Sequence, residues 1–534
     1  MGQTAREGIV RSASLMSLAT MASRLLGLVR EQLFAFLFGA GMATDAFNVA
    51  FRIPNLLRDL FAEGAMSSAF VPTFTARMTR DGPRAAWRLA NLVIHALLVV
   101  VSLIVIAGLV WSEEIINLYA SSFGEVPGKL ALTVLLTRIM MPFLLLVALA
   151  AAAMGCLNAR GRFFVPAIAP AMFNVATIVM GALIWRWPDA FGARPIIWMA
   201  IAALIGGVGQ IAIQAPLLWK EGYRFRFVTR LGEIFGDPGV RRILTLMLPA
   251  TIGLAATQVN IFVNTYFATS IPSAVSWLNY AFRLMQLPLG LFGVAIAAAT
   301  LPAISRHVAE ENPGEFRRTL QHSLRLVFAI NVPASIGLAV LGAPIIRLIF
   351  EHGRFLPSDT AATAAALAFY ALGLFAYSAV KVLVPAFYAL GQTRAPVAIS
   401  VFSVGANVAL SIVLIGPMGF RGLALATSLA AILNFALLMI FIRRAAGEIG
   451  GGDLLSALFK IATAAAFMGA AALATHRWAE GLLGSAGLGA QLTSLGLAIA
   501  GGIVVLLAAG RLLRVQELEG ALSLLIARFR RPKR

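Results

Sequence analysis

Apolar runs of about 20 residues recur along this chain, and each is long enough for a helix to cross the hydrocarbon core of a bilayer. Backbone polar groups cannot stay unpaired in lipid, so spanning segments of this kind must be helices. Of the 534 residues, 60% are hydrophobic and only 12% are charged, which excludes an ordinary soluble domain. The runs lie at roughly 91–111, 130–157, 164–185, 196–219, 243–267, 327–350, 361–390, 396–415, 422–442, 457–475 and 487–510.

Three further segments, at roughly 15–40, 44–75 and 274–304, are long enough to span but carry polar residues. They bring the expected total to about 14 helices. An arginine at the bilayer centre costs roughly 2.5–3.5 kcal/mol even on the lenient insertion scale, so several arginines here must face a watery, protein-lined interior. A cationic interior of this kind indicates a large anionic substrate. The arginines in these segments are Arg24, Arg30, Arg52, Arg58 and Arg283.

The net charge of +20 is concentrated in alternate loops and at both chain ends, as the positive-inside rule requires. Both termini are therefore expected in the cytoplasm, with an even number of spans between them. The loop arginines would set this orientation and contact anionic headgroups, so nucleic acid is not an expected partner. Predicted cytoplasmic positions in the N-terminal half include Arg77, Arg80, Arg84, Arg88, Arg160, Arg162, Lys220, Arg224, Arg226, Arg230, Arg241 and Arg242.

Internal repetition indicates two related halves. The stretch from Asn48 to Arg52 recurs as the stretch from Asn279 to Arg283, 231 residues later. Nearly equal offsets at corresponding depths predict two six-helix lobes, at 1–225 and 226–445, in the same orientation around a central cavity. Residues 446–534 would add a C-terminal helix pair with a basic tail. Further pairs with an offset of 230 or 233 residues are Pro72 and Pro302, Pro83 and Pro313, Arg88 and Arg318, and Asn174 and Asn407.

Polar stripes show where the arginines point. Residues three or four apart share one helical face, and a face with an arginine among small or polar neighbours fits a cavity wall. The stripes are Ser17, Thr20, Arg24, Gly27 and Glu31; Asn48, Arg52, Asn55 and Asp59; and Ser276, Asn279, Arg283, Gln286, Gly290 and Gly293. Prolines are expected to break these helices around the site, at Pro54, Pro72, Pro288 and Pro302.

The alternative role of these arginines is to pair with carboxylates and hold the bundle together. Arg30 and Arg58 each adjoin an acidic residue, and the acids at hand are Glu31, Asp59 and Glu63. These carboxylates are too few to neutralise all five arginines. The excess would suit a diphosphate, because the guanidinium fork binds phosphate oxygens bidentately and stays charged at any working pH.

The residues around the arginines also form longer motifs. They are Ser23-Arg24-Leu25-Leu26-Gly27 followed by Arg30, Gly39-Ala40-Gly41-Met42-Ala43-Thr44-Asp45-Ala46-Phe47, Pro54-Asn55-Leu56-Leu57-Arg58 with Phe61-Ala62-Glu63-Gly64-Ala65, and Arg283-Leu284-Met285. With these motifs the chain resembles the MurJ (MviN) lipid II flippases. The resemblance extends over the whole length and is most specific from 23 to 72.

The resemblance implies the fold of the MOP exporters, all-α and polytopic, with two pseudo-symmetric lobes around a cationic cavity. It implies alternating-access transport of the undecaprenyl-diphosphate-linked peptidoglycan precursor from the inner to the outer leaflet of the bacterial inner membrane. Membrane lipids are further partners, and other cell-wall synthesis proteins stay open as partners. The last two helices, at 454–514, would form a groove for the lipid tail.

The expected site follows from the stripes and the resemblance together. Arg24, Arg30, Arg58 and Arg283 match the essential cavity arginines of the family, and Asp45 matches its acidic residue near the outer end of the second helix. We expect the diphosphate to be bound by Arg24, Arg30, Arg52, Arg58 and Arg283. We expect polar or gating support from Glu31, Asp45, Asn48, Asn55, Asp59, Glu63, Asn279 and Gln286.

Two departures from the family pattern affect the expected mechanism. Phe282 stands where family members often carry an acidic residue, which leaves Arg283 freer for a ligand. The resemblance also brings in sodium, which some members bind through aspartates in the seventh and eleventh helices. The segments 243–267 and 396–415 contain no carboxylate here, so we expect dependence on membrane potential and no sodium site of that kind.

Rival functions differ in what the membrane segments should contain. A cation-coupled multidrug exporter of the same superfamily would need cavity carboxylates for cationic drugs, whereas another lipid-linked oligosaccharide exporter would share the cationic cavity. An enzyme acting on polyprenyl diphosphates would need an acid/base or metal cluster. The five histidines are scattered without ligand spacing and Cys156 is the single cysteine, so no enzyme, metal or cofactor is expected. A non-transporting scaffold would not need the buried arginines.

Overall fold

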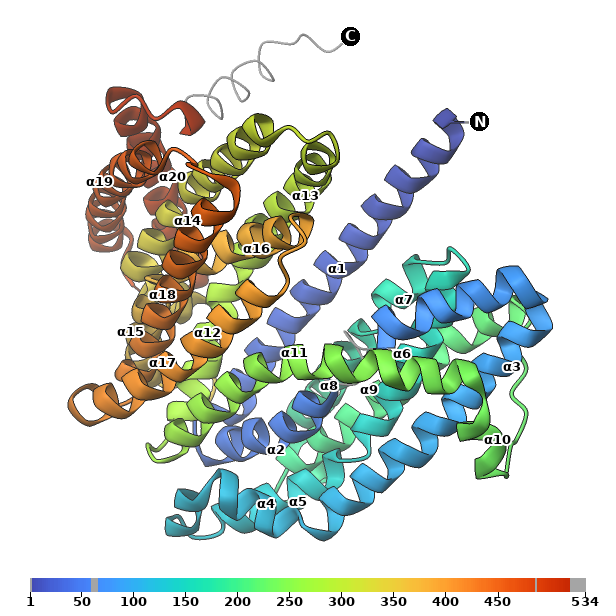
Figure 1. Cartoon of the computed structure of the whole chain (residues 1–534). Coiled ribbons are helices and arrows are strands. Elements are labelled where there is room, and N and C mark those ends of the chain that lie inside the picture. The colour runs from blue at the N-terminus through green and yellow to red at the C-terminus, as the bar shows by residue number, and fades with distance from the viewer. Residues whose placement is uncertain (1, 59–65, 486, 519–534) are drawn as a thin grey trace, which may run out of the picture. The chain divides into compact units, whose positions relative to one another are not determined.

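The described part of the chain is all-helical. The computed structural model describes residues 2–58, 66–485 and 487–518, and within these ranges it contains helices and no strand, which confirms the predicted fold class. The chain divides into two compact units, Met1–Ser276 and Trp277–Arg534 (Figure 1). The lobe boundaries expected from the repeats stay a prediction.

The number of membrane spans follows from length and composition. Ten helical segments within the described residues are long and apolar enough to cross a membrane. The pair α15 (Pro357–Ala371) and α16 (Leu374–Ala389), bent by 42°, raises the number to eleven if it forms one span. The protein is therefore a multi-pass membrane protein. The expected total of about 14 stays a prediction, because it also needs α1, α2 and α11, which are not among these segments.

Two large apolar cores hold helices of the first unit together. Phe70, Phe74 and Leu89 lie at the centre of one core, where α3 meets α6 and the first turns of α11. Phe34 and Met140 belong to the other core, which joins α1 and α2 to α5, α8 and α9. The helices of this unit are α1 (Gly2–Phe38), α2 (Met42–Arg58), α3 (Met66–Val110), α4 (Ser112–Tyr119), α5 (Lys129–Met140), α6 (Phe143–Ala159), α7 (Phe164–Ile168), α8 (Ala171–Arg186), α9 (Ile196–Lys220), α10 (Leu231–Gly236) and α11 (Pro238–Thr269).

The second unit is built around long helices packed on α14. Leu324 and Val327 of α14 are fully buried against Leu383 of α16 and Ile461 of α19. Asn312 caps the start of α14 by accepting the Glu315 N–H at 3.2 Å. The helices of the second unit are α12 (Ala274–Pro288), which starts in the first unit, α13 (Val294–Ala309), α14 (Pro313–Phe350), α15, α16, α17 (Arg394–Met418), α18 (Phe420–Ala446), α19 (Gly451–Leu483) and α20 (Leu488–Leu512).

The expectation that prolines break the site helices was wrong for three of the four positions. Pro54, Pro72 and Pro302 lie inside α2, α3 and α13 respectively. Prolines are tolerated inside membrane helices because neighbouring groups and local adjustments satisfy the backbone that they leave unpaired. Pro288 does end α12, and a π-helical turn follows it at Leu289–Gly293.

The real break in α3 lies at Gly82, where φ is 83° and ψ is 175°. This left-handed backbone conformation suits glycine because glycine has no Cβ. Pro83 follows and starts the next helical stretch, since proline is favoured at a first helical position. The bend separates an amphipathic first part of α3 from the apolar part that was predicted to span at 91–111.

Glu221, directly after α9, fastens the loop between α6 and α7. Its carboxylate accepts from Arg160 Nε at 3.0 Å and from Arg162 Nε at 2.7 Å. The hydrogen bonds from Arg162 and then Arg160 lower the pKa of Glu221 below its ordinary value. A lowered carboxyl pKa contributes stability above the ordinary pKa of glutamate, and this contribution is lost as the pH falls through the lower, folded-state value.

We therefore expect Glu221→Gln to lower the melting temperature of the detergent-solubilised chain at pH 7, with the difference shrinking once the pH falls below about 4. Thermal unfolding at both pH values measures the effect. Glu113→Gln is the matched control, because Glu113 is exposed and forms no ion pair within the described ranges. An equal loss at both pH values would show that the Glu221 charge is not responsible.

Candidate substrate-binding and gating site

Arg30 is held in place by α1 and α8. Its guanidinium forms an ion pair with Glu31 and donates from Nη1 to Asn174 Oδ1 at 3.1 Å. Asn174 Nδ2 in turn donates to the Ser23 carbonyl at 3.0 Å. The carboxylate pairing considered as the alternative is therefore present at Arg30. Asn174 had been noted only as a repeat position, and its role as an arginine partner was missed.

An aromatic platform supports the same guanidinium. Phe173 lies 4.9 Å from the Arg30 Cζ and stacks on Phe51 of α2 with 5.1 Å between ring centroids. Phe143 of α6 closes the group, 5.5 Å from each of the other two rings. A cation over an aromatic face is attracted by the ring quadrupole, so Arg30 is oriented before any ligand arrives.

Arg24 differs from Arg30 although both belong to α1. Its side chain is exposed and, within the described ranges, forms no ion pair or hydrogen bond. On the same stripe Gly27 lies against α8, since a Cβ at this position would come within 3.8 Å of the Asn174 amide nitrogen. The stripe therefore faces protein at Gly27 and leaves the charge of Arg24 uncompensated by any described carboxylate.

Arg52 lies near a buried tyrosine that the sequence did not single out. Tyr119, at the end of α4, is 1% exposed and stacks on Phe262 with 4.3 Å between centroids. Burial raises the pKa of Tyr119 to about 12, and the nearby positive charge of Arg52 partly opposes that rise. Arg52 is half-buried and thus engaged with protein groups of the first unit.

The other predicted residues of α2 are only partly exposed. Asn48, Asn55 and Arg58 are half-buried, whereas the residues on either side of Asn48 are buried. This pattern agrees with a polar stripe along one face of α2. The predicted acids Asp59 and Glu63 lie outside the described residues.

In the second unit, α12 presents a polar face. Arg283 and Gln286 are exposed and Asn279 is half-buried, at helical steps of four and three. The opposite face carries the buried Leu284 and Met285. Arg283 therefore belongs to the accessible side of its helix, and its place on a cavity wall stays a prediction.

Asp45 lies at the centre of a buried polar cluster in the first unit. Its Oδ2 accepts from Lys129 Nζ at 2.8 Å and from the Ser273 N–H at 3.1 Å. Its Oδ1 accepts from the Ser276 N–H at 3.0 Å and from the Ser276 hydroxyl at 2.6 Å. Asp45 and Lys129 are buried, with side chains 1% and 4% exposed. One carboxylate thus joins α2, the start of α5 and the first turn of α12.

The surroundings of this cluster keep both charges in place. The Lys129 ammonium lies 3.9 Å from the centroid of the Phe123 ring, and the ring quadrupole attracts it. Ser273 adopts a left-handed conformation with φ at 65°, which is uncommon for a residue other than glycine. Strain of this kind persists only where the surroundings over-determine it, here through the bond to Asp45. Lys129 opens the apolar run at 130–157 and was not predicted to take part.

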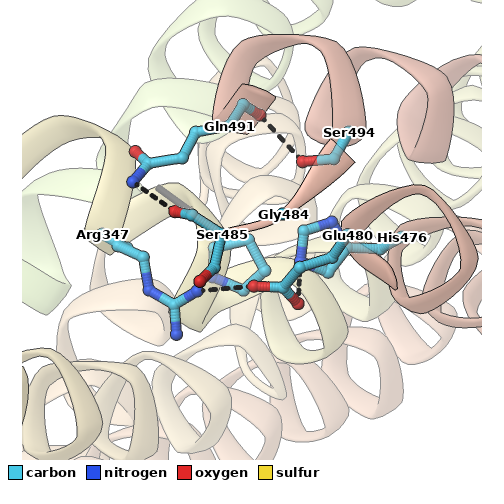
Figure 2. A pocket seen from close by; sticks show the side chains of 8 residues that line it. Arg347, His476, Glu480, Gly484, Ser485, Gln491 and Ser494 are labelled. Atoms are coloured by element: carbon cyan, nitrogen blue, oxygen red, sulfur yellow. Dashed lines mark hydrogen bonds and ion pairs between the residues drawn. The ribbon is translucent and has the colours of Figure 1, made fainter. Parts of the chain in front are cut away.

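A separate polar pocket lies between α14, α19 and α20 (Figure 2). Arg347 Nη1 donates to Glu480 Oε1 at 2.9 Å, and His476 Nε2 lies 3.6 Å from Glu480 Oε2. On the other side, Gln491 Nε2 donates to the Ser485 carbonyl at 3.2 Å. These contacts link the C-terminal helix pair to α14, and none of the predicted site residues lies there. Among the described residues, no group of three or more His, Cys, Asp or Glu side chains could hold a metal ion.

Comparisons with known proteins identify the family of the chain. The family model described as "Lipid II flippase MurJ" matches residues 34–490. A "Probable lipid II flippase MurJ" of Rhizobium meliloti is 37% identical over 494 residues, covering 92% of this chain and 90% of the relative. One of Vibrio cholerae is 35% identical over 443 residues, covering 82% and 83%.

Solved structures with the same fold include two transporters. "Lipid II flippase MurJ, inward closed conformation" matches with a TM-score of 0.76 and 27% identity, covering 93% of this chain and 99% of that structure. A multidrug resistance MATE family transporter of the MOP superfamily matches with a TM-score of 0.64 and 17% identity, covering 84% and 99%, and shows the fold alone. This chain therefore belongs to the lipid II flippase MurJ family, whose members are transporters rather than enzymes.

Proposed function

We propose that this chain carries lipid II, the undecaprenyl-diphosphate-linked peptidoglycan precursor, from the inner to the outer leaflet of the bacterial inner membrane. The names of its relatives support this substrate. The excess of lysine and arginine in alternate loops supports an orientation with both termini in the cytoplasm. The cycle would be alternating access, with the substrate diphosphate bound in the cationic cavity predicted from the sequence.

The observation that carries the proposal is the contrast between Arg24 and Arg30. Arg24 is exposed and lacks a carboxylate partner in the described part of the chain, so its charge is available to a diphosphate. Arg30 is oriented by Glu31, Asn174 and Phe173, so it would contribute a preorganised fork and less net charge. Arg283 would add the charge of the second unit.

The remaining arginines take more restricted roles in this scheme. Arg58, half-buried in the last turn of α2, would contact the diphosphate beside Arg24. Arg52 would act mainly by its charge, because its guanidinium lies beside the hydroxyl of Tyr119. Asn48, Asn55, Asn279 and Gln286 would supply neutral hydrogen bonds to the substrate or to the arginines.

The Asp45 cluster would serve as the gate at the outer end of the site. The two carboxylate oxygens and the four donors that they accept from hold the first turn of α12 to α2 and α5. Opening toward the outer leaflet would require these bonds to break together. A buried ion pair is a suitable switch because each partner is costly to leave alone.

The membrane potential is the expected energy source. An elementary charge moved through the field is worth about 2.3 kcal/mol per 100 mV, and a cavity with uncompensated arginines would be drawn inward by a potential that is negative inside. We expect translocation of labelled lipid II in reconstituted vesicles to slow when the potential is collapsed and to be unaffected by removing sodium. A requirement for sodium with no effect of the potential would overturn this coupling.

A further inference from the structure

The segment 223–230, between α9 and α10, alternates aromatic and basic residues. Its sequence is Tyr-Arg-Phe-Arg-Phe-Val-Thr-Arg, and it is neither helix nor strand. It runs alongside α3 (Figure 1). Phe225 is 52% exposed and Phe227 is 79% exposed, so two large apolar rings project from a non-helical backbone.

Two side chains of α3 satisfy the backbone of this segment. The Asn91 amide pairs with both backbone groups of Arg226, accepting its N–H at 3.1 Å and donating to its carbonyl. His95 Nε2 accepts the Val228 N–H at 3.1 Å, while His95 Nδ1 lies 2.8 Å from the Asn91 carbonyl. Non-helical backbone at membrane depth is tolerated only where protein satisfies it, and these bonds do so.

The ring contacts set the depth of the segment along α3. Trp87, Asn91 and His95 are four residues apart and share one face of the helix. Tyr223 packs on Trp87 with 5.7 Å between centroids, and Phe225 stacks on His95 at 5.1 Å. The segment therefore follows α3 from its basic part, around Arg84 and Arg88, into the apolar run that starts at residue 91.

The arginines of the segment carry a surplus of positive charge. The nearby acids are already paired: Glu221 with Arg160 and Arg162, Glu233 with Arg88, and Asp237 with Arg77. The side chains of Arg226 and Arg230 are exposed, and within the ranges that the structure describes they form no ion pair or hydrogen bond. Arg224 is held by the carbonyls of Trp219 and Tyr223 at 2.7 and 2.8 Å.

From this geometry we infer that segment 223–230 is an interfacial anchor. It buries Phe225 and Phe227 in the cytoplasmic leaflet and binds the phosphodiester headgroups of anionic phospholipids through Arg226 and Arg230. Aromatic rings favour the membrane interface, and basic residues close to an anionic surface are attracted to it. The clamp by Asn91 and His95 holds the segment in place, so little conformational entropy is lost when a lipid binds. This role does not depend on which substrate the chain transports.

The first test measures depth. A nitroxide on Phe227→Cys is compared with one on Leu103→Cys, an exposed position in the apolar part of α3, and one on Arg84→Cys, in the basic part directly after Gly82. Cys156 is buried and the unsubstituted chain gives the labelling background. In vesicles of phosphatidylcholine and phosphatidylglycerol, the label at position 227 should collide with oxygen about as often as the label at position 103 does. If the label at position 227 collided mainly with a water-soluble nickel complex, as expected for the label at position 84, the inference would be overturned. The exposed rings would then be available to a soluble partner instead of the membrane.

The second test measures headgroup selectivity. Association of spin-labelled phosphatidylglycerol relative to phosphatidylcholine is compared in the full chain, in Arg226→Gln/Arg230→Gln and in the control Arg186→Gln/Arg194→Gln. We expect a loss of up to about fivefold for each of Arg226 and Arg230, the factor that corresponds to about 1 kcal/mol per basic residue, and no change in the control. Unchanged selectivity in Arg226→Gln/Arg230→Gln, or an equal loss in both double variants, would contradict the proposed headgroup site.

Discussion

Arg24→Ala is expected to abolish growth in a strain that depends on this chain, without loss of membrane insertion. The Arg24 side chain is exposed and has no carboxylate partner in the described part, so its removal should leave the packing of α1 unchanged. A lost hydrogen bond to a charged group costs roughly 1.5–3 kcal/mol, or about 10- to 150-fold in affinity for the diphosphate. Arg283→Ala should have the same effect from α12.

Two matched variants separate charge from geometry. Arg24→Lys should fail as well, because an ammonium offers a point charge where a planar fork is needed. Arg194→Ala, at an exposed arginine in the loop between α8 and α9, should support normal growth. If Arg24→Ala and Arg283→Ala both supported growth at the rate of the parent chain, these arginines would not belong to the substrate site.

Asp45→Ala is expected to destabilise the chain strongly and to stop transport. It leaves the Lys129 ammonium buried without its carboxylate, and breaking a buried ion pair in this way costs roughly 3–5 kcal/mol. It also removes the acceptor for the Ser273 and Ser276 N–H groups. Thermal unfolding in detergent measures the stability, and growth of a dependent strain measures transport.

The double variant Asp45→Ala/Lys129→Met distinguishes stability from gating. Replacing both charges removes the unpaired ammonium, so most of the lost stability should return. Transport should stay impaired, because the bonds that hold the first turn of α12 are still missing. If the double variant restored both stability and growth, the Asp45 cluster would have a structural role only.

Hydropathy predicted the helices well where a span is bounded by loops. The run at 196–219 corresponds to α9 (Ile196–Lys220), and the run at 422–442 lies within α18 (Phe420–Ala446). It failed for the start of α3, because the predicted segment 44–75 runs past the end of α2 at Arg58 and into the first turns of α3. The helix begins at Met66 and bends at Gly82, well before the predicted span at 91.

Part of the site could be predicted, because stripes are local. The exposed face of α12 with Arg283 and the half-buried stripe of α2 follow from steps of three and four residues. Contacts between distant positions could not be predicted in this way. Asp45 meets Lys129 across 84 residues and Ser276 across 231. Asn174 meets Arg30 across 144 residues. No periodicity within one helix reports on such partners.

The measurement that tests the central proposal most directly is the leaflet in which lipid II accumulates when the chain is depleted from cells. An externally added enzyme that cleaves only outer-leaflet lipid II reports the distribution. We predict that depletion makes lipid II resistant to this cleavage, that restoring the parent chain reverses the effect, and that Arg24→Ala does not. Lipid II that stays fully cleavable in depleted cells would contradict the proposal that this chain moves it across the membrane.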